Sequence, residues 1–191
     1  MTRSRTSVIC VAHAEGAGGP EIGRRLAAEL GFRYVDDEIV VTAAESEQLL
    51  PEAVSQAEAR HPGRWLEVDF NRFEPTETVR GLIRDAILTT ADEGGVVIVS
   101  HAASFALADR DDVLRVRVTA SAETRQRRLS EQGLDDDTAA KAVKESDKDH
   151  KAYLKHFYGV SNEVPLDYDL ILNTDRLSLE QAVDAIVRAA C

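Results

Sequence analysis

A glycine-rich turn is the segment whose residue types best suit chemistry. It reads HAEGAGG over 13–19 and continues as PEIG over 20–23. Glycines adopt backbone angles that other residues avoid, so successive main-chain N–H groups can turn toward one point. The N-terminus of a following helix adds free N–H groups and a partial positive charge. These features predict a phosphate-binding loop made of Gly16, Ala17, Gly18, Gly19, Pro20 and Glu21.

This loop lacks the lysine of the common pattern G-x-x-x-x-G-K-[ST]. With Gly18 as the second glycine, Gly19 takes the lysine position, and no lysine precedes Lys141. One alternative is a turn that only packs a strand against a helix. Another is a dinucleotide-binding motif with Asp36 as the ribose ligand, although Glu21 stands where the last glycine of that motif belongs.

Charged side chains elsewhere supply candidate catalytic residues. Arg125 and Arg128 lie three residues apart on one face of an expected helix, where they would hold phosphates or a base, or form a solvated face. Asp36 would contact the acceptor or act as a base, although a helix N-cap is the favoured role. His101 either supplies positive charge below pH 7 or is an ordinary polar residue. Glu21 either holds Mg²⁺ through water or, as we favour, stabilises the first helical turn.

Short apolar strands alternate with helices and would position these residues. Strands are expected at 7–12, 32–35, 96–100, 111–120 and 168–174. Helices are expected at 20–30, from 36 onward, and at 76–92, 102–108, 122–132, 135–158 and 178–190. The alternation predicts an α/β fold with a parallel sheet covered on both faces, which binds ligands at the carboxyl ends of its strands.

Two strands differ in pattern. The run VVIVS at 96–100 is apolar at every position except its last, as expected of a strand buried on both faces. The run at 111–120 alternates apolar residues with Arg115 and Arg117, which predicts a strand with one wetter face, nearer the edge of the sheet.

Composition excludes several classes of protein. The chain has 191 residues, enough for one domain. Its net charge of −11 argues against a general nucleic-acid or anionic-membrane binder. No apolar run reaches the roughly 18–20 residues that a membrane span requires. The two cysteines indicate no disulfide framework, so we expect a reducing cytoplasm. The five histidines show no metal-ligand spacing, and we predict no protein metal site.

The order of several segments matches one family. The loop AEGAGGPEIG (14–23) is similar to E-Y-G-S-G-G-R-E-I-G, and YVDDEIV (34–40), VIVSHAA (97–103) and YDLILNT (168–174) are similar to segments at its second, third and last strands. The runs ETRQRR (123–128) and DKDHKAY (147–153) are similar to E-x-R-x-x-R and D-K-x-R-x-x-Y. In these motifs the chain resembles the cytidylate kinase-like family of P-loop kinases.

The resemblance implies a three-layer P-loop NTPase-like fold with a five-stranded parallel sheet and a helical lid. It implies one domain over 1–191, with an acceptor-side insertion at 48–75 and a lid at about 122–160. It also implies ATP with Mg²⁺, and a small phosphate acceptor that is a nucleoside monophosphate such as CMP. A lysine-free loop is usual for that family.

Three cationic positions of the family are changed here. Pro20 replaces an arginine of the loop, Ser100-His101 replaces glycine-arginine, and His150 replaces the arginine of D-K-x-R. Phosphoryl transfer depends on fixed positive charge around the migrating group. Two readings follow: an active phosphotransferase, which we rank first, and a pseudokinase that binds a nucleotide or anion as a sensor or partner module.

Overall fold

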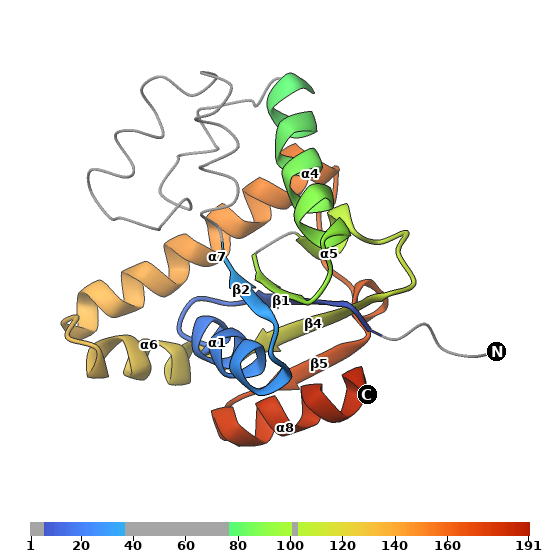
Figure 1. Ribbon diagram of the computed structural model, residues 1–191. Helices are drawn as coiled ribbons and strands as arrows, with labels where there is room; N and C mark the ends of the chain where they lie inside the picture. The colour runs from blue at the N-terminus through green and yellow to red at the C-terminus, as the bar shows by residue number, and fades with distance from the viewer. Residues whose placement is uncertain (1–5, 37–76, 101–102) are drawn as a thin grey trace.

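One parallel sheet organises the molecule (Figure 1). The computed structural model describes residues 6–36, 77–100 and 103–191. The five strands of the sheet lie in the order β2-β3-β1-β4-β5, so the first strand of the chain is the central one. The strands are β1 (Val8–His13), β2 (Arg33–Val35), β3 (Val96–Val99), β4 (Val113–Thr119) and β5 (Leu170–Asn173).

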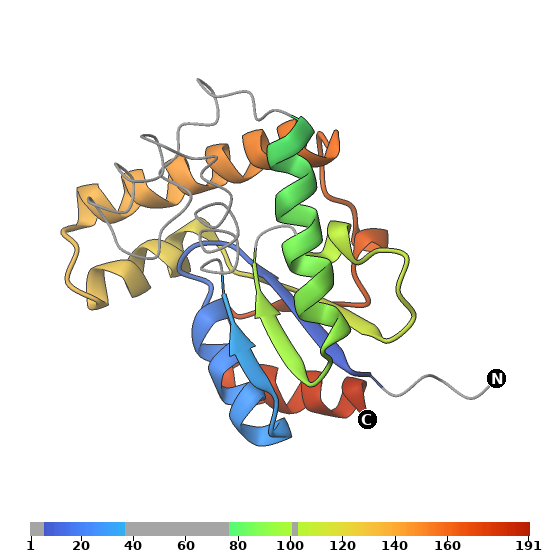
Figure 2. The same cartoon turned by 45° about the horizontal axis from the view of Figure 1, so that its top comes forward.

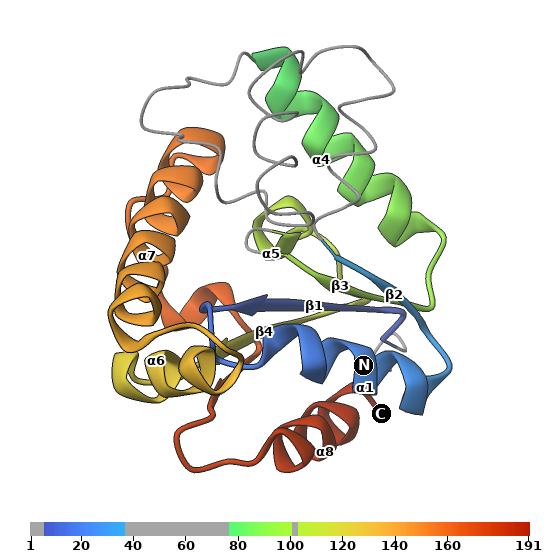
Figure 3. The same cartoon turned by 90° about the vertical axis from the view of Figure 1, so that its left-hand side faces the viewer.

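Helices cover both faces of this sheet, which confirms the three-layer α/β fold (Figures 2 and 3). Helices α1 and α8 pack on one face, whereas α4, α5 and the end of α7 pack on the other. A short 3-10 turn, Pro165–Asp167, precedes β5. The helices are α1 (Gly19–Leu30), α4 (Glu77–Asp92), α5 (Ala103–Ala106), α6 (Ala122–Glu131), α7 (Asp136–Tyr158) and α8 (Leu179–Ala190).

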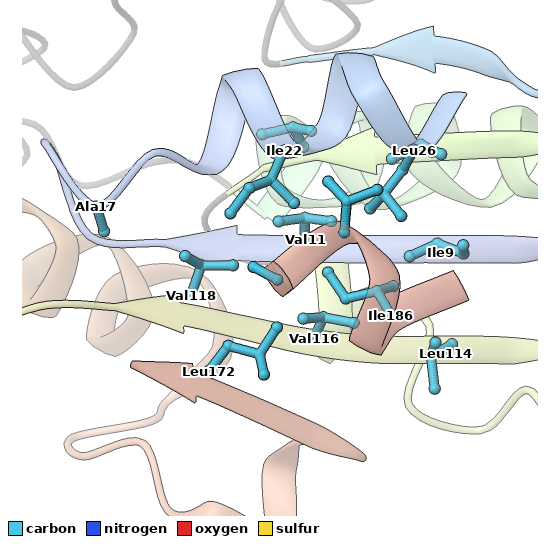
Figure 4. Packing of buried hydrophobic residues seen from close by; sticks show 14 of the residues in the cluster. Ile9, Val11, Ala17, Ile22, Leu26, Leu114, Val116, Val118, Leu172 and Ile186 are labelled. Atoms are coloured by element: carbon cyan, nitrogen blue, oxygen red, sulfur yellow. The ribbon is translucent and has the colours of Figure 1, made fainter. Parts of the chain in front are cut away.

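Apolar residues of the central strands form the core, because these strands are buried on both faces. Every residue of β1 and of β3 is buried, as predicted for the run at 96–100. Alternate positions of β1 enter opposite layers: Ile9 and Val11 pack with α1 and α8, whereas Val8 and Cys10 pack with α4 and α5. Figure 4 shows the first of these layers, where Ile22, Leu26 and Ile186 meet the sheet.

Strand β4 has the alternating burial that the sequence predicts. Leu114, Val116 and Val118 join the core as the alternation requires. Arg115 and Arg117 on the opposite side are partly exposed, so this is the wetter face as predicted, and β4 lies next to the edge strand β5. Both side chains are engaged in ion pairs. The guanidinium of Arg115 pairs with Asp169, and the Arg117 side chain, 16% exposed, pairs with Glu163 at 3.1 Å.

Local signals in the sequence set the helix ends. Pro20 stands in the first turn of α1, and Gly31 ends that helix in the left-handed conformation at φ 66°. Ser178 caps α8 in a capping box with Gln181. The expected helix from 36 onward, the insertion at 48–75 and His101 lie outside the described residues, apart from Asp36 itself. None of the described helices is long and apolar enough to cross a bilayer.

Candidate phosphate-binding site

A cavity of about 600 Å³ opens where the chain leaves the carboxyl end of β1 and enters α1. This volume lies within the range of small-molecule sites. Residues 14–18, called here the glycine loop, form one wall, and the C-terminal part of α6 and the start of α8 form others. The residues that line the cavity are His13, Glu15, Gly16, Gly18, Pro20, Glu21, Arg24, Arg128, Leu129, Glu131, Gln132 and Leu179.

The glycine loop needs glycine at two positions because it runs against other elements at left-handed angles. Gly16 has φ 77°, and a Cβ there would lie 2.8 Å from the carbonyl oxygen of Arg125 in α6. Gly18 has φ 92°, and its Cβ would lie 2.6 Å from a methyl group of Leu179. Side chains at these positions would therefore push the loop away from α6 and α8.

Several main-chain amides of the loop and of the first turn of α1 have no main-chain acceptor in the described part of the chain. The N–H of Ala17 donates to the Ala14 carbonyl at 2.9 Å, and the N–H of Ile22 donates to the Gly18 carbonyl at 3.0 Å. Within the described part of the chain, the amides of Gly16, Gly18, Gly19 and Glu21 donate to no main-chain carbonyl outside α1. The helix dipole points its positive end toward the same place, so this end of α1 suits an anion.

The six predicted loop residues occupy different places relative to the cavity. Gly16, Gly18, Pro20 and Glu21 line it. Ala17 and Gly19 are buried in the wall behind, and a Cβ on Gly19 would lie 2.3 Å from the ring of His13. Pro20 supplies no N–H, so the first turn of α1 presents one amide fewer than another residue would allow.

Arg128 reaches the glycine loop. One terminal nitrogen donates to the Gly16 carbonyl at 3.3 Å and to the hydroxyl of Thr174 at 2.9 Å, and the other donates to the Thr174 carbonyl at 2.7 Å. The side chain also lines the cavity. Arg128 thus brings positive charge beside the loop while three acceptors hold its guanidinium in place.

Arg125, the other predicted arginine, turns toward α7 instead. Its guanidinium makes two hydrogen bonds of 2.7 Å to the carboxylate of Asp147, and the residue is 5% exposed. A fork of this kind is the strongest arginine–carboxylate arrangement. Its main chain and Cβ lie against Gly16 of the loop, while its guanidinium does not bond the loop. The two arginines therefore lie on the same helix but have different roles: Arg125 pairs with α7, whereas Arg128 bonds the glycine loop.

Acidic residues outnumber the arginines in the cavity wall. Glu15, Glu21 and Glu131 line it together with Arg24 and Arg128. The carboxylate of Glu21 is 2.7 Å from the guanidinium of Arg25. A bare polyphosphate would meet repulsion from these carboxylates, which a divalent cation bound to the phosphates would reduce.

The wall suits Mg²⁺ bound in that way. Among the described residues, no cluster of three or more His, Cys, Asp or Glu side chains could hold a metal ion alone. Mg²⁺ is usually bound through one or two carboxylates together with substrate phosphates. Glu15 and Glu21 are carboxylates beside the amides that would receive those phosphates.

The other two predicted catalytic residues are Asp36 and His101. Asp36 directly follows β2 and is half-buried, and it is not among the residues that line the cavity. His101 lies outside the described residues. Sequence reasoning missed Thr174 as a partner of the loop, although the closing motif YDLILNT ends on it.

A second cavity, of about 250 Å³, lies beside α7 and the segment that follows it. At its wall Glu163 accepts hydrogen bonds from Tyr168 and from His150, the latter at 2.8 Å, and pairs with Arg117. We call Arg117, His150, Glu163 and Tyr168 the α7 cluster. Burial acts to raise the pKa of Glu163, but the hydrogen bonds from His150 and Tyr168 and the charge of Arg117 outweigh it and hold this pKa below its ordinary value.

A parallel sheet with a glycine loop between its central strand and the next helix, and with a cavity at that loop, defines a protein of the P-loop kinase type. The chain belongs to the Cytidylate kinase-like family, whose family model matches residues 8–176. It is 28% identical over 193 residues to a cytidylate kinase of Methanopyrus kandleri, covering 96% of this chain and 92% of that one.

Solved structures share the fold. An uncharacterized protein from Eubacterium ventriosum superposes with a TM-score of 0.75 at 19% identity, covering 97% of this chain and 98% of that one. A shikimate kinase from Bacteroides thetaiotaomicron superposes with a TM-score of 0.55 at 17% identity, covering 95% and 97%. These likenesses bear on architecture, and confirm the predicted P-loop fold.

Proposed function

We propose that this protein transfers the γ-phosphoryl group of ATP, in the presence of Mg²⁺, to a small phosphate acceptor such as CMP or another nucleoside monophosphate. Family membership supports a kinase-type reaction. The observation that carries the proposal is the glycine loop itself. Among the residues that the structure describes, the amides of Gly16, Gly18 and Gly19 have no main-chain partner outside α1, and they lie beside a cavity of nucleotide-binding size. The region 122–160 would form the lid, and the insertion at 48–75 would meet the acceptor.

In this proposal the chain's own residues bind and orient the nucleotide. The amides and the start of α1 would hold phosphate oxygens, and Arg128 would add positive charge beside them. Glu15 and Glu21 would face the Mg²⁺ that accompanies the phosphates. Asp36 and His101, which follow β2 and β3, would act on the acceptor. The free cysteines Cys10 and Cys191 agree with the reducing cytoplasm in which we place the protein.

A pseudokinase is the second candidate, and one observation favours it. The guanidinium of Arg125 is buried against Asp147, and that of Arg128 is engaged by Gly16 and Thr174. Loop and lid positions where the family carries arginine hold Pro20 and His150. An arginine that stabilises the transferring group contributes about 10³-fold or more to phosphoryl transfer. A site whose two predicted arginines are both held by other groups would therefore bind nucleotide but turn it over slowly.

Turnover over a panel of acceptors separates the two candidates. The purified protein is incubated with ATP, Mg²⁺ and each nucleoside monophosphate, and the diphosphates are resolved by ion-exchange chromatography. A Gly18→Val variant, whose side chain would meet Leu179, controls for contaminating kinases. We expect turnover with one class of monophosphate in the wild type and none in the variant.

Calorimetric titration with Mg-ATP completes the test. Binding without turnover of any acceptor would favour the pseudokinase. Folded protein that neither binds ATP nor turns it over would defeat both candidates, and binding of NAD(P) but not ATP would support the dinucleotide alternative.

A further inference from the structure

Thr174 sits where β5 ends and is almost wholly enclosed, at 1% exposure. Its amide donates to the carbonyl of Thr119 at 2.8 Å, which fixes its main chain to the end of β4. Its hydroxyl donates to the carbonyl of Ala17 at 2.9 Å, and the same oxygen accepts from Arg128 at 2.9 Å. One buried hydroxyl therefore connects the glycine loop, α6 and the sheet.

Arg128 and Thr174 hold the carbonyls of Gly16 and Ala17, the two consecutive residues at the middle of the glycine loop. Arg128 donates to the Gly16 carbonyl at 3.3 Å, and Thr174 donates to the Ala17 carbonyl. The peptide bond between Ala17 and Gly18 is trans, so its N–H points opposite to its C=O. Fixing the Ala17 carbonyl on Thr174 therefore turns the Gly18 amide away from Thr174. Gly18 lines the cavity, as the proposed function requires of a phosphate ligand.

We infer that Thr174 is a positioning residue that fixes the orientation of the glycine loop and thereby its affinity for phosphate. The Arg128 guanidinium shares this role, because its two terminal nitrogens bridge Thr174 to the loop. We call Gly16, Ala17, Arg128 and Thr174 the loop clasp. In a loop without a lysine side chain, affinity for phosphate depends on how accurately the main-chain amides are oriented, and the loop clasp fixes that orientation. The inference rests on the proposed function for the identity of the ligand but not for the geometry of the clasp.

Three threonine variants test the role of the hydroxyl. Thr174→Val keeps the shape of the side chain and removes the hydroxyl, whereas Thr174→Ser keeps the hydroxyl. Thr138→Val is the matched control, because Thr138 also loses a hydroxyl hydrogen bond, the 2.6 Å contact to Asp135 at the exposed start of α7. Arg128→Lys removes the guanidinium half of the clasp, keeps a positive charge and leaves the Thr174 side chain in place, so it replaces Thr174→Val if that variant does not fold.

The first readout is amide hydrogen exchange without nucleotide. The Ala17 amide is protected by its bond to Ala14, so its exchange reports on the loop. We expect about tenfold faster exchange at Ala17 in Thr174→Val, and wild-type exchange in Thr174→Ser and Thr138→Val. Equal exchange in Thr174→Val and the wild type would overturn the positioning role, whether or not the protein binds nucleotide.

The second readout is the dissociation constant for Mg-ATP, measured by calorimetry. We expect Thr174→Val to weaken binding about tenfold, equivalent to about 1.4 kcal/mol, and Thr174→Ser to restore it. A Thr174→Ser protein as weak as Thr174→Val would show that the hydroxyl is not the active group. A wild type that binds no nucleotide would defeat the proposed function, while the exchange experiment would still decide whether Thr174 holds the loop.

Discussion

The loop clasp and the α7 cluster both hold irregular chain near α6 and α7, but by different chemistry. In the loop clasp, the acceptors are neutral: the carbonyls of Gly16, Ala17 and Thr174 and one hydroxyl. In the α7 cluster, Glu163 is the anion between Arg117 and His150. Neutral acceptors keep their bonds at any moderate pH, whereas the cluster depends on the charge of a carboxylate. The contrast teaches that the proposed binding site is held by the less pH-sensitive of the two regions.

Gly16→Ala should have the largest effect and tests the loop side of this comparison. The substitution forces a side chain into left-handed backbone and to 2.8 Å from the Arg125 carbonyl. We expect the free energy of unfolding to fall by about 2–4 kcal/mol, measured by urea denaturation, because strain and steric overlap add. Gly31→Ala is the control: it shares the left-handed angle, at φ 66°, but a Cβ there has no neighbour within 4 Å. Equal losses in the two variants would show that close approach to α6 is unimportant.

Glu163→Gln should have the next largest effect and breaks the α7 cluster. It leaves Arg117, whose side chain is 16% exposed, without its carboxylate partner. We expect a loss of about 1–3 kcal/mol in the free energy of unfolding. Glu145→Gln is the control, because Glu145 pairs with Lys141 at 3.8 Å on an exposed surface. A Glu163→Gln protein as stable as Glu145→Gln would mean that the cluster contributes nothing to stability.

The pH dependence of stability sharpens the comparison. The folded pKa of Glu163 is lowered, since its hydrogen bonds and neighbouring positive charge outweigh its burial. Its stabilising contribution is therefore complete above the unfolded pKa of about 4.3 and is lost as pH falls through the folded pKa. Urea denaturation should show that the difference in the free energy of unfolding between wild type and Glu163→Gln becomes smaller from pH 5 to pH 3. Asp112, whose pKa Arg110 lowers to about 2 against the effect of burial, is present in both proteins and cancels.

A difference in the free energy of unfolding between wild type and Glu163→Gln that stays constant from pH 5 to pH 3 would contradict the pH dependence proposed for the α7 cluster. The same pH series applied to Gly16→Ala should show no narrowing, because the loop clasp contains no carboxylate. If the free-energy differences of Glu163→Gln and Gly16→Ala from the wild type became smaller by the same amount, the two regions would not differ in pH dependence.

Lys141→Ala should have the smallest effect. Lys141 is 74% exposed in its side chain and pairs with Glu145 across one helical turn of α7. Pairs of this kind contribute about 0.3–0.5 kcal/mol. Thermal unfolding should shift by about 2 °C or less; a larger shift would indicate that α7 is held by its surface charges rather than by the cluster.

Local signals made most of the fold predictable from sequence. Pro20, Gly31 and Ser178 mark helix ends through their own backbone or side-chain chemistry, which requires no distant partner. The face of β4 that carries Arg117 was less predictable. Alternation shows that a face is polar but not whether water or an ion pair covers it, and the Asp169 that pairs with Arg115 lies 54 residues away.

The candidate site divides in the same way. Gly16 and Gly18 could be predicted because a left-handed turn before a helix demands glycine. Thr174 ends the motif YDLILNT, but the motif does not show that its hydroxyl bonds the Ala17 carbonyl, 157 residues away in the sequence. Arg125 and Arg128 look equivalent on a helix, and only the positions of Asp147 and Thr174 separate them.

The central claim is that main-chain amides of the glycine loop hold phosphate without a lysine. The most direct measurement is a titration of ¹⁵N-labelled protein with Mg-ATP, followed by the amide resonances. We predict saturable shifts that are largest at Gly16, Gly18, Gly19 and Glu21. Saturable binding whose shifts leave these amides unchanged, or no binding at all by folded protein, would contradict it.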